Sequence, residues 1–367
     1  MMRYIHQRDE WTAFRWSMDR LAAPLAAIRH KQGMLLGKMA MLGFPVRAEA
    51  ALETLTLDVV KSSAIEGEKL DMEQVRSSLA KRLGVPVAGV VPVNRHVDGI
   101  VEMVLDATRN YAKPLTAERL FGWHAALFPT GYSGMRKITV GGWRTADAGP
   151  MQVVSGAIGR ESVHFEAPPA EKLEQEMRHF LQWFNTPQQI DPVIKAAIAH
   201  FWFVTIHPFE DGNGRIARAI ADCALAQADN CPERFYSMSA SIERDRKDYY
   251  TILERSQKGD SDITDWLNWF LGCLERAIDG ADKTLARVMR KARVWQQANQ
   301  CSLNDRQRVI LNRLMDHFAG KLTSSKYAKL VKCSHDTALR DIRQLQEYGL
   351  LQEEGKGRST SYILTEK

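Results

Sequence analysis

The chain has 367 residues, 45% hydrophobic and 26% charged, with a formal net charge of +6, and this composition supports one large core and a smaller second one. Five scattered cysteines, none in a C-x-x-C pair, argue against a disulfide framework and against a zinc site. No segment approaches a transmembrane helix, and the charges in residues 1–10 are unlike a signal peptide, so we expect a cytoplasmic protein without a membrane partner.

The N-terminal part of the chain, residues 1–95, is expected to be a helical region. A helix is predicted from Arg47 through Ile65, because its apolar residues recur at helical spacing. Gly67 is a residue type that commonly follows a helix end. Residues 71–74, Asp-Met-Glu-Gln, are typical of a capping box that opens the next helix.

A strand and two buried helices are predicted in the middle of the chain. Residues 151–156 are β-branched and glycine-bounded, which favours a short strand. Residues 192–206 are largely apolar and have the length of an ordinary globular helix. A second buried helix is expected from Ile216 to Leu225. Between these helices, the glycines of residues 211–214 permit backbone conformations that a Cβ would forbid.

Residues 207–218, HPFEDGNGRIAR, combine groups that suit a site for a polyphosphate, a metal ion and a proton acceptor. The glycine loop and the free N–H groups at the start of the second helix form an anion site. Arg215 and Arg218, three residues apart on one side of the helix, add full positive charges. Asp211 offers a hard oxygen ligand for Mg²⁺, and His207 can act as a general base.

This dodecapeptide matches, without a gap, the HPFx(D/E)GNGRxxR signature of the Fic family, which the chain resembles. Most members of that family transfer AMP from ATP to a hydroxyl side chain of a target protein. The resemblance implies a mainly α Fic-fold core with a β-hairpin flap. It also implies a role for each matched residue: His207 deprotonates the target hydroxyl, Phe209 anchors the loop, Asp211 holds Mg²⁺, Gly212, Asn213 and Gly214 cradle the phosphates, and Arg215 and Arg218 contact the outer phosphates.

The resemblance extends to segments on both sides of the signature. Residues 114–128 resemble the family's early helix, with Thr116 as a plausible N-cap. Residues 142–145 followed by 151–156 resemble the flap, a hairpin that aligns the target by adding a strand; a purely structural hairpin is the alternative. Residues 246–250 match a segment whose tyrosines lie against the adenine, although adjacent tyrosines also pack helix faces. The nucleotide contacts so implied are Val153, Val154, Ser155, Gly156, Tyr249, Tyr250 and Gln257.

A second motif, residues 62–67 (SSAIEG), fits the pattern (S/T)xxxE(G/N) of self-inhibited Fic proteins. The four-residue spacing places Ser62 and Glu66 on one face of a helix. In the family, Glu66 would pair with Arg218 and occupy the place of the γ-phosphate, because an Arg–carboxylate pair is directional and costly to break. The family often has Asn shortly after the Glu-Gly pair, whereas this chain has Glu68.

The positive charge of the chain is concentrated at its C-terminal end. Residues 281–367 carry a net charge of +8, whereas the first 280 residues carry −2. Residues 281–300 are expected to form a basic helical linker. Residues 349–357 contain glycines and a lysine, but their spacing does not fit a Walker phosphate-binding loop.

Residues 301–367 are expected to form a small domain that resembles a winged helix-turn-helix. Helices are predicted over 306–318, 325–331 and 335–348, with Ser334 capping the third helix, Gly349 ending it, and a basic turn leading to a strand at 361–364. The apolar stripe of the third helix is Ala338, Leu339, Ile342 and Leu345, and its open side carries His335, Thr337, Arg340, Arg343 and Gln344. The resemblance implies binding in the DNA major groove, but such domains also dock proteins or form dimers.

Two functions remain in view. The first is an autoinhibited protein adenylyltransferase that transfers AMP from ATP to a Ser, Thr or Tyr hydroxyl of a target and of itself; Asp211 favours it over the family's phosphotransferase branch. His207 and Glu66 could also support removal of AMP. The second is a nucleotide-sensing transcriptional regulator. The expected divisions are an N-terminal region (1–95), a Fic core (96–280), the linker and the C-terminal domain, and the expected partners are a target protein, DNA and a second copy in a homodimer.

Overall fold

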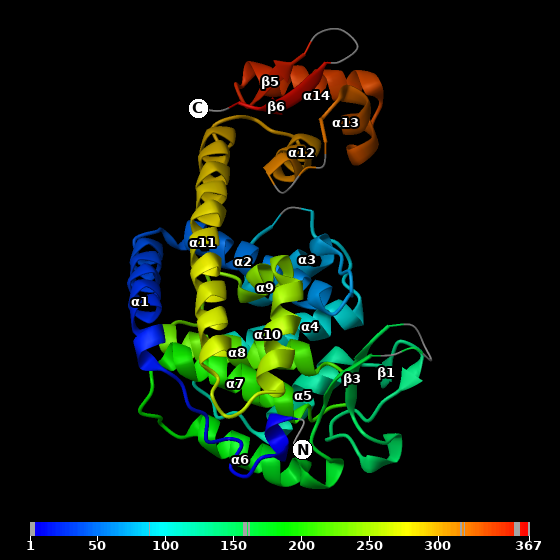
Figure 1. The fold of residues 1–367 in the computed structure, drawn as a ribbon. Coiled ribbons are helices and arrows are strands. Elements are labelled where there is room, and N and C mark those ends of the chain that lie inside the picture. The colour runs from blue at the N-terminus through cyan, green and yellow to red at the C-terminus, as the bar shows by residue number, and fades with distance from the viewer. Residues whose placement is uncertain are drawn as a thin grey trace.

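The structure is a computed structural model that describes residues 4–87, 89–156, 160, 162–315, 318, 320–355 and 360–365. It is mainly helical, as the sequence predicts, with small antiparallel hairpins (Figure 1). None of the helices in the described ranges combines the length and the apolar character that a membrane span needs. The helices are α1 (Met18–Ala40), α2 (Phe44–Ile65), α3 (Met72–Leu83), α4 (Arg95–Arg109), α5 (Ala117–Leu127), α6 (Leu173–Asn185), α7 (Pro192–Ile206), α8 (Asn213–Asp229), α9 (Met238–Arg244), α10 (Arg246–Gln257), α11 (Thr264–Ala298), α12 (Asp305–Met315), α13 (Ser324–Val331) and α14 (His335–Glu347).

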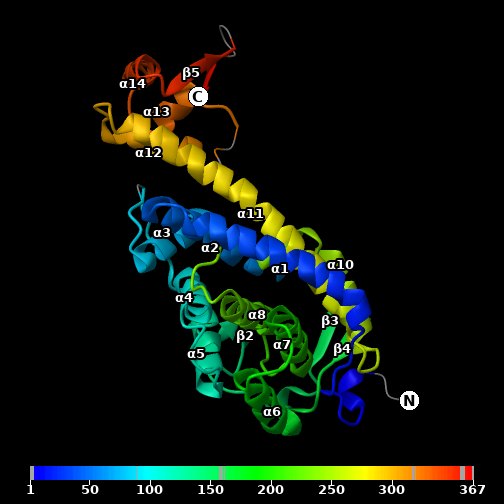
Figure 2. The same cartoon turned by 90° about the vertical axis from the view of Figure 1, so that its left-hand side faces the viewer.

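The strands pair in three separate two-stranded sheets, each with antiparallel register. The first sheet joins β1 (Tyr132–Ser133) to β2 (Arg136–Lys137), which the sequence did not reveal. The second joins β3 (Gln152–Ser155) to β4 (Ser162–Glu166), and the third joins β5 (Leu351–Glu354) to β6 (Ser361–Leu364). The β5–β6 sheet lies beside the C-terminal helices, whereas β3 lies beside the helices at the other end of the molecule (Figures 1 and 2). The three small sheets are separate from one another, so the fold is built on its helices.

Helices α7 and α8 form the centre of a large hydrophobic core. Nearly all residues of α7 are buried, and α8 buries an alanine- and isoleucine-rich surface against it. The N-terminal helices α1 and α2 contribute to the same core, since Leu21, Leu55 and Val59 belong to one buried cluster with the residues of α7. The N-terminal region therefore packs as part of the central body.

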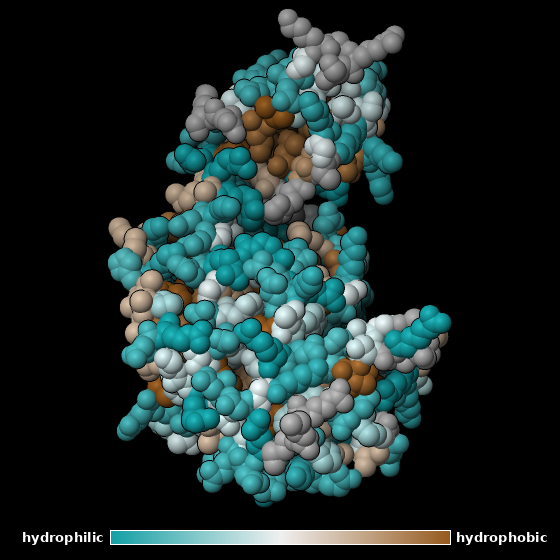
Figure 3. All heavy atoms as spheres, viewed as in Figure 1, coloured by the Kyte–Doolittle hydropathy of each residue, from teal (hydrophilic) through white to brown (hydrophobic). Residues whose placement is uncertain are grey.

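The long helix α11 connects this body to the C-terminal helices. Figures 1 and 2 show it running from the central body to the group formed by α12, α13 and α14. Its first half is buried in the large core, whereas Ala298 belongs to a second, smaller core with Ile310, Ile342 and Leu345. The visible face of the molecule is mostly hydrophilic, with an apolar patch on the C-terminal group (Figure 3). The linker predicted over 281–300 is thus the second half of a helix that starts inside the central body.

The C-terminal elements follow the order expected for the small domain. Three helices precede the hairpin β5–β6, and Leu322 makes an additional antiparallel bridge to Tyr362. Ser334 caps α14 by accepting a hydrogen bond from the Thr337 amide, as predicted. The turn between the strands, predicted to be basic, includes residues 356–359, which lie outside the described residues.

Two local predictions are corrected. Residues 142–145 are not a strand of the flap hairpin: the partner of β3 is β4, farther along the chain, because Arg144 is drawn into the interior instead. Asp71 does cap α3, accepting from the amides of Glu73 and Gln74, but the capping box is incomplete. The side chain of Gln74 accepts a hydrogen bond from the Asn94 amide instead of returning to Asp71.

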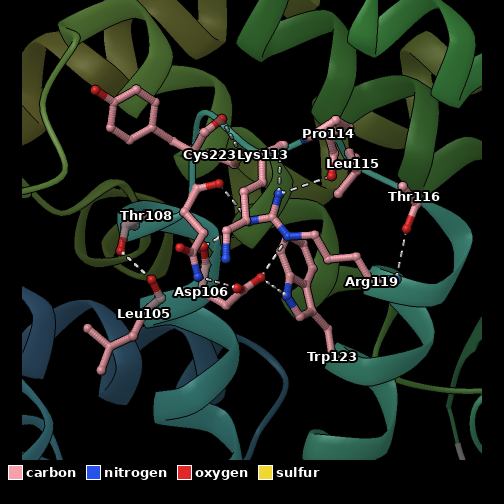
Figure 4. A network of polar contacts seen from close by, with 12 residues as sticks. Leu105, Asp106, Thr108, Lys113, Pro114, Leu115, Thr116, Arg119, Trp123 and Cys223 are labelled. Atoms are coloured by element: carbon pink, nitrogen blue, oxygen red, sulfur yellow. Dashed lines mark hydrogen bonds and ion pairs between the residues drawn. The ribbon is translucent and has the colours of Figure 1, made fainter.

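A polar network fixes α5 against the C-terminal end of α4 (Figure 4). The guanidinium of Arg119 donates to the carboxylate of Asp106 at 2.7 Å and to its backbone carbonyl at 2.8 Å. The indole of Trp123 donates to the same carboxylate at 2.7 Å. These bonds satisfy helix-end carbonyls and orient α5, which carries His124 toward the loop between α7 and α8.

We predict that acid weakens the fold through two buried histidines. Burial lowers the pKa of His200 to about 3 and that of His124 to about 4, so both stay neutral when folded. Below about pH 6 these histidines are protonated in the unfolded chain but stay neutral in the folded chain. Each of them should therefore lower the free energy of unfolding by about 1.4 kcal/mol for each unit by which the pH falls. Urea unfolding at about pH 7 and about pH 5 would measure this slope. His200→Gln should reduce it and exposed His30→Gln should not; an unchanged slope in His200→Gln would contradict the assignment.

Candidate active site

The candidate site is built around the loop between α7 and α8. His207 ends α7 in the left-handed conformation, with φ of 52°, and this turns the chain sharply out of the helix. Phe209 is fully buried, and its ring stacks on that of His124 with centroids 4.2 Å apart. The aromatic anchor expected from the sequence is therefore formed with a partner from α5.

Asn213 closes the loop through its side chain. Its Oδ1 accepts from the Phe209 amide at 2.9 Å, and its Nδ2 donates to the Phe209 carbonyl at 2.8 Å. Both ends of the side-chain amide are thus used inside the loop, which leaves one N–H of Nδ2 and the backbone amide for other partners. Gly212 has φ of +81°, and a Cβ there would come 2.9 Å from the ring of Phe128, which explains why this position needs glycine.

His207 is oriented as a base. Its Nδ1 lies 3.2 Å from the Val204 carbonyl, which can only accept, so Nδ1 carries the hydrogen and Nε2 keeps its lone pair. Among the described residues, Nε2 has no hydrogen-bond partner. Burial lowers the pKa of His207 to about 4, so the imidazole is neutral near pH 7 and able to accept a proton.

Arg144, which the sequence did not indicate as a site residue, holds the backbone beside His207. Its Nε donates to the His207 carbonyl at 2.8 Å, and its Nη2 donates to the Pro168 carbonyl at 2.5 Å. Its own amide donates to the Pro208 carbonyl at 2.9 Å. Burial lowers the pKa of Arg144 to about 10, which leaves the guanidinium charged. The segment predicted as part of the hairpin is instead bonded to the loop between α7 and α8.

Arg218 is bound by the end of α2. Its side chain is 2% exposed, and Nη2 donates to Oε1 of Glu66 at 2.7 Å and to the Ser62 carbonyl at 2.9 Å. Its Nε donates to the Ser62 hydroxyl at 2.9 Å. Gly214 makes room for this carboxylate, because a Cβ at that position would lie 2.1 Å from Oε1 of Glu66. The structure thus brings Ser62, Glu66 and Arg218 together in the pairing that the motif implies.

Arg215 is engaged by a carboxylate that the sequence did not single out as a partner. Its Nη1 donates to Oε2 of Glu68 at 2.9 Å, while its guanidinium lies 5.2 Å from the centre of the Phe128 ring. Two donors of the arginine pair have no partner among the described residues, namely Nε of Arg215 and Nη1 of Arg218, and both atoms are buried. Buried N–H groups without acceptors are costly, so these donors indicate where an anionic ligand would bind.

Asp211 lies at the opening of the site. Its Oδ1 accepts from the Gly212 amide at 2.6 Å, and its Oδ2 accepts from the Ser133 hydroxyl. It shares a cavity of about 420 Å³ with Glu66, Glu68 and Arg215. Within the described ranges no cluster of three or more potential ligands forms a protein-built metal cage. One carboxylate beside a phosphate pocket fits Mg²⁺, which is usually held by one or two carboxylates together with substrate phosphates.

The predicted adenine contacts occupy different environments. Tyr249 is buried, and its hydroxyl lies 3.0 Å from Nε2 of His200. Gln257 is also buried and donates to the Thr205 hydroxyl at 3.3 Å. Tyr250 is 37% exposed, and its hydroxyl lies 3.5 Å from Oε2 of Glu66. Of these three residues only Tyr250 is exposed, and the nucleotide contacts stay predictions for all three.

The flap is attached to α10 by side chains that the sequence did not indicate. Val153 is half-buried, Val154 and Ser155 are exposed, and Gly156 ends the strand; residues 157–159 and 161 lie outside the described residues. The hydroxyl of Ser155 lies 2.6 Å from Nε2 of His164, whose Nδ1 lies 2.8 Å from Oε2 of Glu254. A β-bulge in the hairpin leaves His164 without a cross-strand partner, and such bulges re-aim side chains near active sites.

Two parts of the chain match known families. Residues 114–225 match the Fic/DOC family, and residues 4–85 match a domain of unknown function, DUF4172. The chain is 27% identical over 228 residues to the protein adenylyltransferase Fic of Nematostella vectensis, covering 60% of this chain and 47% of that protein. It is 27% identical over 210 residues to the protein adenylyltransferase fic-1 of Caenorhabditis elegans, covering 57% and 38%. The chain therefore spans less than half the length of these relatives.

Solved structures support the fold. A Fic family protein from Desulfovibrio desulfuricans G20 aligns with a TM-score of 0.52 at 21% identity, covering 94% of this chain and 96% of that chain. A Fic domain containing signaling protein from Bacteroides thetaiotaomicron VPI-5482 also has a TM-score of 0.52 at 21% identity, covering 72% and 98%. At this level of identity the likeness shows a shared fold.

We predict that Asn213→Ala destabilises the loop that carries His207. The change leaves the buried amide and carbonyl of Phe209 without partners, which should cost about 1–3 kcal/mol in the free energy of unfolding. Urea unfolding at neutral pH would measure the loss. Asn299→Ala, at an exposed helix end, is the matched control and should change little. Equal stability of the two variants would contradict a closing role for Asn213.

Proposed function

Because this chain carries a Fic/DOC family domain, we propose that it is an autoinhibited protein adenylyltransferase. It would transfer AMP from ATP to a Ser, Thr or Tyr hydroxyl of a target protein, and of itself. The observation that carries this proposal is the pairing of buried Arg218 with Glu66 and Ser62 beside a histidine poised as a base. In this proposal His207 supplies the base for the transfer, and Glu66 is the group that would compete with the substrate.

The base function follows from the orientation of His207. In the proposed reaction the target hydroxyl gives its proton to Nε2 of His207, and its oxygen forms a bond to the α-phosphorus of ATP. The bond from that phosphorus to the bridging oxygen breaks, and pyrophosphate leaves. Arg144 and the Val204 carbonyl hold the imidazole and its backbone in place, so that Nε2 faces the reacting centre without reorganisation.

The phosphates would be bound at the start of α8. The first amides of this helix have no acceptor within the helix and lie at the positive end of its dipole. The buried Nε of Arg215 and Nη1 of Arg218 supply two further donors. Asp211 would hold Mg²⁺, which arrives with ATP and neutralises phosphate charge.

Glu66 would keep the enzyme inactive by competing for Arg218. The γ-phosphate of ATP would not be able to bind Nη2 of Arg218 while the carboxylate of Glu66 occupies it. The contact is charge-assisted and largely desolvated on the arginine side, which makes it directional. The same carboxylate and His207 could orient and deprotonate a water, so removal of AMP from a modified target is compatible with the site.

We predict that Glu66→Gly increases AMP transfer. Losing one charge-assisted contact of about 1.5–3 kcal/mol should raise activity by about 10- to 100-fold. Labelling of the protein itself and of a lysate with ATP radiolabelled at the α-phosphate would measure the change. His207→Ala in the Glu66→Gly background should abolish labelling. A Glu66→Gly protein that binds ATP but labels nothing would contradict the enzyme assignment.

The alternative function is a nucleotide-sensing transcriptional regulator that uses its C-terminal domain to bind DNA. One observation favours a DNA partner: α14 presents Arg340 and Arg343 to solvent, and exposed Lys329 and Lys332 precede it. Cations beside a helix in this arrangement suit phosphate and base contacts in the major groove. An intact base at His207 favours the enzyme, because a sensor has no need of one. The cytoplasmic location and the homodimer stay predictions.

We predict that duplex DNA binds the full chain in a salt-dependent manner. Arg340→Ala with Arg343→Ala should weaken binding, and deletion of residues 301–367 should remove it. Electrophoretic mobility shifts at two salt concentrations would measure the effect. Arg178→Ala, which removes an exposed positive charge from α6 in the central body, is the control. Binding that survives both arginine changes would contradict the assignment of α14 to DNA.

A further inference from the structure

The turn between α2 and α3 carries two carboxylates that reach two different arginines. Glu66 and Glu68 flank Gly67, whose φ of +83° belongs to the left-handed region that favours glycine. The amides of Glu66 and Glu68 both donate to the Ser63 carbonyl, at 3.1 and 3.0 Å, so the turn is closed on the end of α2. The conformation at Gly67 therefore presents both side chains to α8.

The contact of Glu68 with Arg215, at 2.9 Å, is similar to the 2.7 Å contact of Glu66 with Arg218. Arg215 has a side chain only 7% exposed and donates to Oε2 of Glu68 at 2.9 Å. The guanidinium packs against the ring of Phe128, which restricts its movement away from the site. Glu68 is about as exposed as Glu66, 32% against 31%, so both carboxylates sit at the rim and reach inward to buried arginines.

Glu68 is held from its other side by His96 of α4. Nδ1 of His96 lies 3.1 Å from the Leu127 carbonyl, and Nε2 contacts Oε1 of Glu68. The ring of His96 therefore bridges the Leu127 carbonyl and the carboxylate of Glu68. Burial alone would raise the pKa of Glu68, but its bond to His96 and the charges of His96 and Arg215 outweigh this and lower the pKa. The carboxylate is thus ionised and fixed on both oxygens.

We propose that Glu68 is a second inhibitory carboxylate, which occupies Arg215 while Glu66 occupies Arg218, so that a nucleotide triphosphate must displace both. This inference rests on the proposed function and deepens its regulation. The two glutamates cancel the charge of the two arginines, and Asp211 adds a further negative charge beside them. The triphosphate of ATP is therefore attracted by the charges of Arg215 and Arg218 only after both carboxylates have moved away from them.

Removal of Glu66 alone leaves Arg215 covered. The two contacts involve different arginines, so each can break without the other, and their effects on nucleotide binding should combine. Both belong to one turn, however, and a movement of residues 66–68 would release both arginines together. The expected consequence is that Glu68 weakens the binding of ATP in the presence and in the absence of Glu66.

The test measures nucleotide affinity and not transfer. All proteins carry His207→Ala so that no turnover occurs, and isothermal titration with Mg²⁺-ATP compares the parent, Glu66→Gly, Glu68→Gln and the double variant. Glu68→Gln keeps the shape of the side chain but removes its charge. It should tighten ATP binding about tenfold in both backgrounds. AMP, which lacks the outer phosphates, should bind with little change. Glu73→Gln, on the exposed surface of α3, is the matched control.

Several results would overturn the proposal. They are an ATP dissociation constant that Glu68→Gln leaves within about twofold of its parent, weaker ATP binding, an equal gain for AMP, or no ATP binding by any of the proteins. His96→Gln provides a second variant, since it loosens Glu68 without touching Arg215 and should tighten ATP binding to a smaller extent. Thermal unfolding of each variant establishes that it is folded. Tight ATP binding without AMP transfer by proteins that retain His207 would contradict the adenylyltransferase function. The proposed role of Glu68 in ATP binding would not be affected by that result.

Discussion

The guanidinium of Arg218 and its need for acceptors is the constraint on which the rest of the site depends. A helix leaves its last carbonyls unsatisfied, and Arg218 caps α2 by donating to the carbonyl of Ser62. The same nitrogen donates to Glu66, and its neighbour Nε donates to the Ser62 hydroxyl. A buried cation requires such partners, and the negative end of the helix dipole adds to their effect. The position of Arg218 therefore depends on the end of α2 as well as on Glu66.

The loop between α7 and α8 is held in a related way, because several of its polar groups are bonded within the protein. Asn213 binds both backbone groups of Phe209, and Arg144 binds the carbonyl of His207 from a distant segment. Phe209 itself is locked by stacking on His124, which the Asp106 network holds through α5. The donors left over, on Arg215 and Arg218, are those that a phosphate chain can use. The site is thus organised before any ligand binds, which lowers the entropy that binding would cost.

Local patterns in the sequence indicated most of the fold near the site. The helix over 192–206 has the bounds predicted from its apolar run, and α2 begins three residues before its predicted start. The next helix begins at Asn213, three residues before the apolar run, because Gly212 in the left-handed conformation opens it earlier. The sequence predicted residues 142–145 as the partner of β3, but the partner is β4. In the structure Arg144 is bonded to the loop between α7 and α8 instead. The pairing of one strand with another cannot be predicted from the spacing of residues within each strand alone.

By itself, the sequence determined which chemical groups are available to this protein: the imidazole of His207, the carboxylate of Asp211, two arginines, and a helix end with Ser62 and Glu66 on one face. These are properties of residue type and of short-range spacing, which a helix or a loop conveys directly. The Glu66–Arg218 pair was implied by the family motif, but only the tertiary structure decided which other charges meet, because α2, α4 and α8 are far apart in the chain and are brought together by packing. It showed that Tyr249 is buried while Tyr250 faces the site. It also showed that Glu68, which the sequence presented only as a departure from a family pattern, lies on Arg215. Long-range ion pairs follow from the three-dimensional arrangement of the helices, and no spacing along the chain encodes them.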